Sequence, residues 1–245
     1  MICLVLAAGY ATRLYPLTEN FPKPLLKVGE KTILNWLLDD VDQFEEVSEI
    51  VVISNHKFIG HFKEWESLQK FTKKLTVLDD GSTDNDNRLG AVKDLIFAQE
   101  KLNIQDDLLV LAGDNVLDFS LKEFVDFVLE KKTSCVMCHE ENRIEKQQKT
   151  AIIVKDEKDL IVSYEEKPKV PKGNLAVPPF YYYLRSDADR MNEAIASGCS
   201  ADAPGSFAAW LSTKSDVHAW DMTGKRYDIG DLKSYELAQK LFKKL

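Results

Sequence analysis

Residues 2–26, ICLVLAAGYATRLYPLTENFPKPLL, decide the fold of this chain. The first six residues of the stretch are all apolar, which is typical of a strand in a parallel sheet covered on both faces. Gly9 follows almost at once, and two basic residues, Arg13 and Lys23, stand in the loop after it. The stretch therefore predicts a buried first strand that opens onto a positively charged loop.

The first half of the chain continues as apolar strands alternating with amphipathic helices. This alternation predicts an α/β fold with a doubly wound, mostly parallel, Rossmann-like central sheet. Ligands of such sheets lie beyond the carboxyl ends of the strands, so we expect chemistry after Ala7 and after Ala112. The expected strands are Ile2–Ala7, Ile50–Ser54, Leu75–Leu78 and Leu108–Ala112, and the expected helices are Thr32–Phe44, Phe58–Gln69, Gly90–Lys101 and one from Ser120 to Lys131.

The second half changes character, because its strands are not joined by full crossover helices. It predicts an added, smaller, β-rich region within a single domain, 1–245, whose first half is 1–132 and whose second half is 133–245. The polar run Asp79–Arg88 and the proline-rich run Pro168–Pro179 are expected to be loops at the ligand face. The expected elements are strands Ser134–Glu140, Ala151–Lys155, Leu160–Glu165, Phe180–Leu184 and Val217–Asp221, a helix Asp187–Ser197 capped by Ser186, and a last helix from Asp231 with Leu232, Tyr235, Ala238, Leu241 and Leu245 facing inward.

Composition and charge narrow the class of protein. The 245 residues include 32 Lys and Arg against 40 Asp and Glu, a formal charge of −8. Such an acidic chain argues against nucleic acid as a partner, because nucleic-acid binding relies on a basic surface. No apolar run has the length of a secretory leader or a membrane span, so we expect a cytoplasmic protein without a membrane partner. Cys135 and Cys138 form a C-x-x-C without a second ligand pair, so we interpret them as thiols of a half-buried strand.

The loop after the first strand matches neither of two common phosphate motifs. It lacks the G-x-x-x-x-G-K-[ST] of a P-loop and the G-x-G-x-x-G of a dinucleotide fold. What remains is small residues, whose backbone N–H groups can approach a phosphate, followed by Arg13 and Lys23. Arg13 offers a planar fork to a phosphate chain, and Lys23 offers a compact charge on a backbone fixed by Pro22 and Pro24.

At this point the chain resembles the sugar-1-phosphate nucleotidyltransferases, with the glucose-1-phosphate thymidylyltransferases and their uridylyl, guanylyl and cytidylyl relatives nearest in pattern. Residues 4–26 are similar to the family signature L-A-x-G-x-G-T-R-L-x-P-L-T followed by P-K-P-L-L. Four further matches follow in order: Leu89-Gly90-Ala91 with L-G-T/A, Ala112-Gly113-Asp114-Asn115 with G-D-N, Tyr164-Glu165-Glu166-Lys167-Pro168 and Pro171-Lys172-Gly173-Asn174 with E-E-K-P…P-K-S-N, and Tyr227-Asp228-Ile229-Gly230 with W-x-D-I-G.

The resemblance implies an enzyme that joins a nucleoside triphosphate to a phosphorylated small-molecule acceptor, a sugar 1-phosphate, and releases pyrophosphate. Arg13 and Lys23 are the implied catalytic residues, and Mg²⁺ is the implied cofactor, held by Asp114 and Asp228. The implied acceptor-binding residues are Glu166, Lys167 and Asn174. The implied nucleotide-binding residues are Leu6, Ala8, Gly9, Tyr10, Ala11, Thr12, Arg13, Leu89 and Gly90.

Three departures from the family pattern bear on these expectations. Ala11 replaces the second signature glycine, which costs about 1 kcal/mol if that position requires a positive φ. Lys149-Thr150-Ala151 stands where the family often has a glycine, and Val177-Pro178-Pro179-Phe180 replaces a looser approach to the next strand. The last two changes touch the acceptor pocket. We also expect no hexapeptide-repeat module after the last helix.

Several alternatives stay open at the level of sequence. The acceptor could be phosphocholine or another small phospho-compound, which would make the protein a cytidylyltransferase. Asp84-Asn85-Asp86 is a literal D-x-D, the metal motif of many nucleotide-sugar-dependent glycosyltransferases. A catalytically silent binding subunit is a third class, against which the retained charged residues argue. Nucleobase, acceptor and pathway are not specified, and a homo-oligomer is compatible with the sequence.

Overall fold

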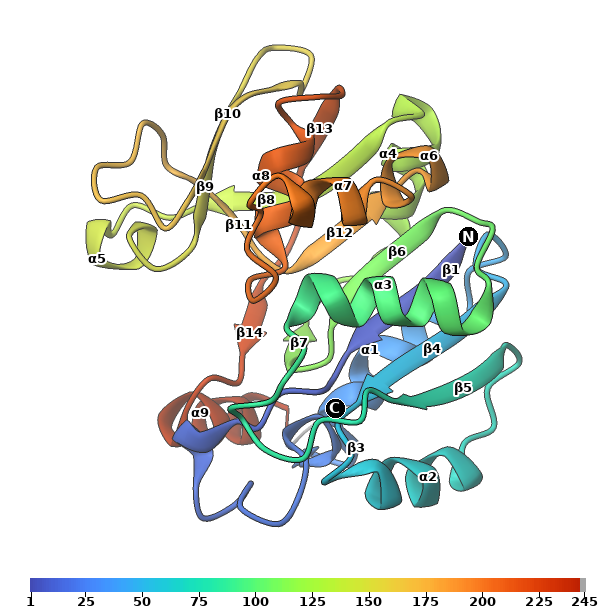
Figure 1. Cartoon of the computed structure of the whole chain (residues 1–245). Helices are drawn as coiled ribbons and strands as arrows, with labels where there is room; N and C mark the ends of the chain where they lie inside the picture. Colours follow the sequence, from blue (N-terminus) through green and yellow to red (C-terminus); the bar gives the residue numbers. More distant parts are fainter. Residues whose placement is uncertain (243–245) are drawn as a thin grey trace. The chain divides into compact units, whose positions relative to one another are not determined.

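The computed structural model describes residues 1–242 (Figure 1). The chain divides into two compact units. The first comprises Met1–Arg88, Ala112–Lys122 and Gly224–Leu245, and the second comprises Leu89–Leu111 and Glu123–Thr223. The predicted functional division at residue 132 stays a prediction.

The first unit contains the parallel sheet that the apolar runs predict (Figure 1). β1 pairs with β4 and β4 with β5, both in parallel, so that Leu4 faces Val51 and Val51 faces Thr76. The α/β class is confirmed. The elements of this unit are β1 (Ile2–Leu6), the 3₁₀ turns η1 (Thr12–Leu14) and η2 (Lys23–Leu25), β2 (Lys27–Val28), β3 (Lys31–Thr32), α1 (Ile33–Val41), β4 (Glu49–Ser54), α2 (Ile59–Leu68), β5 (Lys74–Asp79), β7 (Asn115–Leu117), β14 (Arg226–Asp228) and α9 (Leu232–Leu241).

Local chemistry sets the ends of the helices in this unit. Thr32 caps α1, because its hydroxyl accepts a hydrogen bond of 3.0 Å from the backbone N–H of Asn35. Asp231 caps α9 in the same way, and the hydroxyl of Ser234 completes a capping box. The buried side of α1 is the predicted apolar stripe, which consists of Ile33, Leu34, Leu37, Leu38 and Val41.

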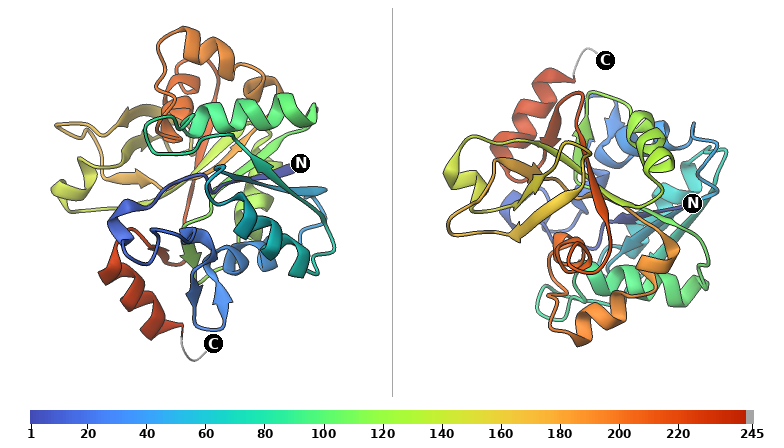
Figure 2. Two further views of the ribbon diagram at one scale, coloured as in Figure 1. Left: turned by 60° about the horizontal axis from the view of Figure 1, so that its bottom comes forward. Right: turned by 90° about the horizontal axis from the view of Figure 1, so that it is seen from above.

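The terminal helix α9 packs with only part of the predicted apolar stripe: Ala238 is buried and Tyr235 packs beside it, as predicted. Ala238 and Phe242 are buried in a small core with Ile229, whereas Leu232 and Leu241 are 39% and 48% exposed. The prediction that these two leucines face inward is wrong, because the β2–β3 hairpin fixes the rotation of the helix: Tyr235 donates a 2.8 Å hydrogen bond to the carbonyl of Lys27. Figure 2 shows α9, in red, together with this blue hairpin. Leu245 lies outside the described residues.

The second unit contains the predicted β-rich strands between residues 134 and 221, together with α3, β6 and most of α4 from the first half of the chain. Its sheet runs in the order β10-β9-β11-β8-β12-β6, all antiparallel neighbours, and β13 pairs with β8 in parallel. The elements are α3 (Ala91–Leu102), β6 (Leu108–Ala112), α4 (Lys122–Lys131), β8 (Ser134–Glu140), α5 (Ile144–Gln147), β9 (Ala151–Lys155), β10 (Ile161–Glu166), β11 (Leu175–Val177), β12 (Phe180–Tyr183), α6 (Arg185–Ala188), α7 (Met191–Ala196), α8 (Gly205–Leu211) and β13 (Val217–Asp221); Ala112 and Lys122 belong to the first unit.

Two predictions for this unit need correction. The helix predicted over 187–197 is split into α6 and α7, because the backbone leaves the helical conformation at Arg190, with φ −92° and ψ 4°. The buried carboxylate of Asp187 fixes α6 by accepting from the hydroxyls of Ser134, at 2.6 Å, and Ser215, at 3.1 Å. Leu184, not Ser186, is the N-cap residue of α6. The proline-rich run 168–179 is not all loop, since it contains β11, which pairs with β8 and β9 between its flanking prolines.

Among residues 1–242, no helix combines the length and the apolar character that a bilayer crossing requires.

Candidate active site

The loop after β1 is anchored at its start by buried backbone groups. Ala7 donates its N–H to the carbonyl of Ile53, and the Asn55 side-chain amide donates a 2.9 Å hydrogen bond to the carbonyl of Ala8. Asn55 is completely buried and also accepts from the N–H of Phe58. These bonds fix the chain just before Gly9, where an added Cβ would meet no atom within 4 Å. The backbone at Gly9 is therefore open to a ligand.

Ala11 adopts a left-handed conformation, with φ 46° and ψ 42°. This is the backbone state that favours glycine, so the departure from the family signature does place an alanine where φ is positive. Two donors hold its carbonyl: the N–H of Leu14 at 3.0 Å and the hydroxyl of the fully buried Thr18 at 2.8 Å. The turn that brings Thr12 and Arg13 out of the loop thus depends on these two bonds.

Tyr10 points into the unit and meets the polar loop after β5. Its hydroxyl lies 3.4 Å from the hydroxyl of Ser82, which in turn donates to the buried carboxylate of Asp80. The D-x-D of the same loop behaves differently, because Asp84 is exposed and accepts hydrogen bonds from the backbone N–H groups of Asp86 and Asn87. That pattern is ordinary turn chemistry.

Lys23 is the most constrained basic residue of the site. It lies in η2 between two prolines, and only 9% of its surface is exposed. Its ammonium donates to Asp114 Oδ2 at 2.6 Å and to the carbonyl of Ile229 at 2.9 Å. An ammonium has three donors, so one N–H remains after these two bonds.

Asp114 is positioned by its neighbours in the G-D-N motif. A Cβ at Gly113 would lie 3.2 Å from a Val5 methyl group, so this glycine allows the segment to approach the end of β1 closely. The side-chain amide of the buried Asn115 donates to Asp114 Oδ1 at 2.7 Å. Burial raises the pKa of Asp114, but the charge and hydrogen bond of Lys23 and the charge of Arg226 outweigh it and hold the pKa below its usual value. Asp114 is therefore a carboxylate at neutral pH.

The pairing of β14 with β7 brings Asp228 close to Asp114. Asp228 ends β14, where it pairs with Asn115, and the following N–H, that of Ile229, donates to the carbonyl of Asp114 at 3.2 Å. Asp228 is 52% exposed, and Arg226 Nη1 lies 3.9 Å from its Oδ2.

Arg13 flanks the same ribbon end. A Cβ built on Gly230 would lie 3.8 Å from Arg13 Nη2 and 3.7 Å from Asp228 Oδ1. Arg13 is exposed, and its charge adds to the hydrogen bonds from Ser234 that hold the pKa of Asp231 below its usual value. The structure therefore brings all four predicted side chains of the first unit, those of Arg13, Lys23, Asp114 and Asp228, to one end of the ribbon.

The donor set at this place suits a hard divalent cation. Both carboxylates offer oxygen, the ligand that Mg²⁺ and similar ions prefer. Within the described part of the chain no three His, Cys, Asp or Glu side chains gather as a complete metal cage. A pair of carboxylates fits Mg²⁺, which commonly takes its other ligands from substrate phosphates and water.

The predicted acceptor residues lie in the second unit, and the structure gathers only part of them. Glu166 and Lys167 are neighbours, with Lys167 Nζ 3.9 Å from Glu166 Oε1. Lys167 has a left-handed backbone, φ 48°, which turns the chain at the end of β10. Asn174 lies apart from them. Glu166 faces Ala151, which in turn faces Val177 at the end of β11, whereas Asn174 precedes the start of β11. The Asn174 side chain bonds to Asn142 at 3.3 Å.

Sequence analysis did not find the polar groups around Glu166. Its Oε2 and the hydroxyl of Tyr164 lie 2.7 Å and 3.1 Å from the Cβ position of Gly205, and the Tyr181 hydroxyl lies 3.4 Å from it. The Tyr164 hydroxyl is buried and has no hydrogen-bond partner among residues 1–242. Burial raises the pKa of Glu166, and the charge of Lys167 offsets this in part. The alternation of residues along β10 puts Tyr164 and Glu166 on one face, which was the available signal.

Gly90 has a structural requirement of its own. Its φ is +90°, and a Cβ there would lie 2.7 Å from the carbonyl oxygen of Ala201. The same carbonyl accepts the N–H of Val92. Leu89 and Gly90 thus lead into α3 at a point where only glycine fits.

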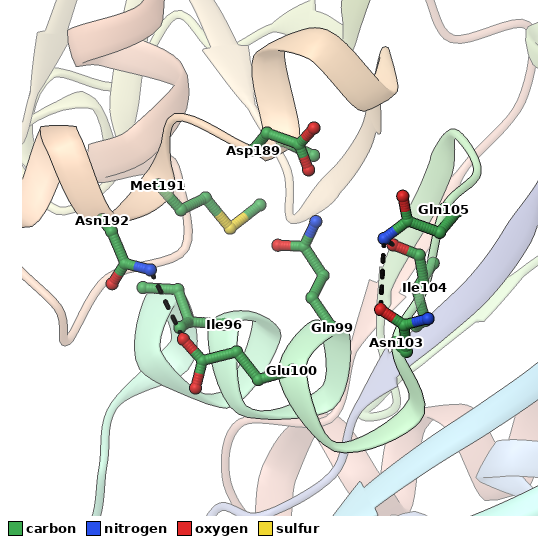
Figure 3. Close-up of a pocket in the computed structure, with 10 residues that line it drawn as sticks. Ile96, Gln99, Glu100, Asn103, Ile104, Gln105, Asp189, Met191 and Asn192 are labelled. Atoms are coloured by element: carbon green, nitrogen blue, oxygen red, sulfur yellow. Dashed lines mark hydrogen bonds between the residues drawn. The ribbon is translucent and has the colours of Figure 1, made fainter.

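Two other features of the second unit do not form an active site. Between α3 and the α6–α7 region lies a cavity of about 210 Å³ lined mostly by carboxamides, carboxylates and aliphatic groups, with Asn192 bonded to Glu100 and Gln105 to Asn103 (Figure 3). Its lining has no basic side chain for a phosphate. The C-x-x-C thiols are free and buried in β8, and burial raises the pKa of Cys135 to about 12, which makes it a poor nucleophile.

Comparisons with known proteins agree with this geometry. A family model described as "Nucleotidyl transferase" matches residues 2–244. The bifunctional protein GlmU of Methanococcus aeolicus is 32% identical over 184 residues, which cover 75% of this chain and 40% of that protein. Glucose-1-phosphate adenylyltransferase of Fervidobacterium nodosum is 26% identical over 248 residues, covering 96% of this chain and 59% of that protein. The chain thus spans roughly half the length of these curated relatives.

The fold is also found among solved structures. A UDP-glucose pyrophosphorylase crystallised with UDP-glucose superposes with a TM-score of 0.83 at 18% identity, over 99% of this chain and 98% of that one. At this identity the likeness concerns the fold.

Proposed function

The chain belongs to the nucleotidyl transferase family, and from that premise we propose that it joins a nucleoside triphosphate to a sugar 1-phosphate, giving a nucleotide-sugar and pyrophosphate. One observation carries the proposal: Lys23 Nζ lies 2.6 Å from Asp114 Oδ2, at the ribbon end where Arg13 and Asp228 flank Gly230. Two cationic side chains and two carboxylates at the mouth of the signature loop suit a reaction between anions.

The proposed reaction needs no general base. An oxygen of the acceptor phosphate attacks the α-phosphorus of the triphosphate, the new P–O bond forms, and the bond to the bridging oxygen breaks as pyrophosphate leaves with the electron pair. A phosphate monoester is already largely doubly ionised at neutral pH. The obstacle is charge repulsion, which calls for positioning and electrostatic stabilisation.

Lys23 and Arg13 have different tasks in this proposal. Lys23 is already oriented by two hydrogen bonds, so its remaining N–H can meet the charge that develops around the α-phosphate without further ordering. Arg13 is exposed and its charge acts only at a distance on Asp231, so its guanidinium donors are available to the outer phosphates that become pyrophosphate. The backbone around Gly9, with Leu6, Ala8, Tyr10, Ala11 and Thr12 on either side, would line the nucleotide, together with Leu89 and Gly90.

Asp114 and Asp228 would hold Mg²⁺ in the proposed enzyme. Mg²⁺, when bound, neutralises part of the phosphate charge and polarises the P–O bonds. The chain contributes an ionised Asp114 whose orientation is fixed by Asn115 and an exposed Asp228 on the adjacent strand.

The acceptor side of the proposal uses Glu166, Lys167 and Asn174. The exposed ammonium of Lys167 suits the acceptor phosphate, and the Glu166 carboxylate suits hydroxyl groups, which donate hydrogen bonds. We also propose that the protein works in the cytoplasm, in nucleotide-sugar biosynthesis. A homo-oligomer stays a prediction that size-exclusion chromatography with light scattering would test.

A matrix of the common nucleoside triphosphates against phosphorylated acceptors, scored by pyrophosphate release with Mg²⁺, tests the proposal. Turnover with a sugar 1-phosphate supports it. Turnover only with phosphocholine or another small phospho-compound, release of a nucleoside diphosphate from a nucleotide-sugar, or no turnover in any pair would refute it. Asp114→Asn should abolish the reaction, whereas Asp86→Asn, a matched change in an exposed turn, should leave it unchanged.

A further inference from the structure

Arg226 is a basic residue that neither the motifs nor the proposed reaction accounts for. It begins β14, and its side chain is 20% exposed. The guanidinium donates a 2.6 Å hydrogen bond to Asn115 Oδ1 and lies 3.9 Å from Asp228 Oδ2. It therefore contacts one of the two carboxylates proposed to hold a metal ion, that of Asp228, and the side chain next to the other.

The contacts of Arg226 reach Asp114 through one intermediate side chain. Asn115 accepts from Arg226 and donates to Asp114 Oδ1 at 2.7 Å. On the other side of the carboxylate, Lys23 donates to Oδ2 at 2.6 Å. Both oxygens of Asp114 already accept a hydrogen bond, and its charge is balanced within the fold.

Each of the two carboxylates thus has a cation within 4 Å, Asp114 that of Lys23 and Asp228 that of Arg226. A bare divalent cation would meet two carboxylates whose charges are already balanced by two fixed cations, so these four side chains carry no net charge. A triphosphate changes this balance, because it brings several negative charges of its own that attract both the ion and the two basic side chains.

We propose that Arg226 makes this site select a divalent cation already complexed with a triphosphate over the bare ion. The inference rests on the proposed function, since it assumes that Asp114 and Asp228 are the metal ligands. Arg226 acts as a positioning and charge-balancing residue and touches neither reacting phosphate in this scheme. The consequence is an order of binding in which the metal enters with the nucleotide.

Mn²⁺ binding, followed by the electron paramagnetic resonance signal of the free ion, tests the inference without turnover. One titration uses Mn²⁺ alone. The other uses Mn²⁺ with analogues of the common nucleoside triphosphates in which a methylene group replaces the oxygen between the α- and β-phosphates, so that pyrophosphate cannot leave. Arg226→Gln should raise the affinity for Mn²⁺ alone by on the order of tenfold, because one unit of positive charge near the ion is lost. The affinity with the nucleotide analogue should rise less or fall.

Two control variants separate charge from structure. Arg226→Lys keeps the charge and loses the planar fork, so its affinity for Mn²⁺ alone should stay within about twofold of wild type. Lys225→Gln removes one cation from the preceding, exposed position and should also change nothing. Circular dichroism of each variant checks that it is folded.

Three results would overturn the inference: equal affinity for Mn²⁺ alone in wild type and Arg226→Gln, Arg226→Lys behaving like Arg226→Gln, or wild type binding bare Mn²⁺ as tightly as Mn²⁺ with the analogue. The last comparison needs no variant, so misfolding of Arg226→Gln leaves the inference falsifiable. The Mn²⁺-only series contains no substrate. A failure of the acceptor matrix therefore bears on the proposed function, whereas a flat Mn²⁺-only series with normal turnover bears on Arg226 alone.

Discussion

Replacing Ala11 by glycine should make the protein more stable, although a glycine in a loop usually has the opposite effect. Ala11 holds φ at 46°, a conformation in which the Cβ of an L-residue is crowded by its own backbone. Leu14 and Thr18 fix the Ala11 carbonyl, so the turn keeps its shape when the side chain is removed. The substitution therefore removes local strain without releasing the loop.

Two opposing terms set the magnitude. A left-handed backbone costs an alanine about 1–2 kcal/mol, and glycine escapes this cost. Glycine loses about 0.5–1 kcal/mol more conformational entropy on folding than alanine does. The balance favours Ala11→Gly by about 0.5–1 kcal/mol in the free energy of unfolding. For a chain of 245 residues, this corresponds to a rise in Tm of roughly 1–4 °C.

Thermal unfolding by circular dichroism measures the shift, and the same loop supplies a matched control. Gly9 does not adopt a left-handed conformation, and an added Cβ would meet nothing within 4 Å. Gly9→Ala should therefore also raise Tm, because the reduced entropy of the unfolded chain adds about 0.4–1 kcal/mol to the free energy of unfolding. Alanine-to-glycine at position 11 and glycine-to-alanine at position 9 are then both stabilising. The difference in backbone conformation explains this, because φ is positive at Ala11 and not at Gly9. A fall in Tm for Ala11→Gly, with Gly9→Ala still stabilising, would refute the reasoning.

Three further predictions follow from single contacts. Lys23→Met should lower kcat/KM for pyrophosphate release by about 10²–10³, because a preoriented cation is lost; steady-state kinetics with Lys27→Met as the exposed control checks this. Gly90→Ala should destabilise the protein by about 2 kcal/mol, since φ is +90° and the new Cβ would lie 2.7 Å from the Ala201 carbonyl oxygen; an unchanged Tm would contradict it. Hydrogen bonds from Arg143 lower the pKa of Glu141 to about 2. The stability they add is present above pH 4.5 and is lost as pH falls towards 2, so the Tm deficit of Glu141→Gln at pH 7 should shrink steadily below pH 4.5.

The sequence predicts best those elements whose signal is local. β6 spans Leu108–Ala112, the bounds expected from its unbroken apolar run, because five consecutive apolar residues have few alternatives to a buried strand. The bounds of β8, β9 and β13 also agree with the sequence prediction. The four charged residues Arg13, Lys23, Asp114 and Asp228 could be named because each lies in a short motif with a fixed spacing. Their functional roles stay predictions.

Other features depend on pairings between distant parts of the chain. Arg226 and Asn115 are 111 positions apart, and nothing local indicates that β14 lies beside β7. β11 has only three residues and stands between prolines, so its pairing with β8 and β9 is invisible to periodicity. The rotation of α9 is set by its hydrogen bond to Lys27, more than 200 positions earlier, which is why the apolar pattern alone placed Leu232 and Leu241 inside.

The basic residues of the first unit are held in two different ways, which bears on how an acidic chain would bind the proposed anionic substrates. Lys23 and Arg226 are largely buried and are paired with carboxylates in the fold, so their charges are held in place before any ligand arrives. Arg13 is exposed and forms no ion pair within residues 1–242, so its charge is screened by salt and is free for a ligand. Pairing prevents the two buried cations from destabilising the folded state, because an isolated buried charge is costly. In the proposed reaction, a triphosphate that arrives with its metal ion would share these pairs without leaving an unpaired charge, whereas either component alone would disturb them. The net charge of −8 therefore does not oppose anion binding at this place, since the local balance around Asp114 and Asp228 is set by the nearest cations.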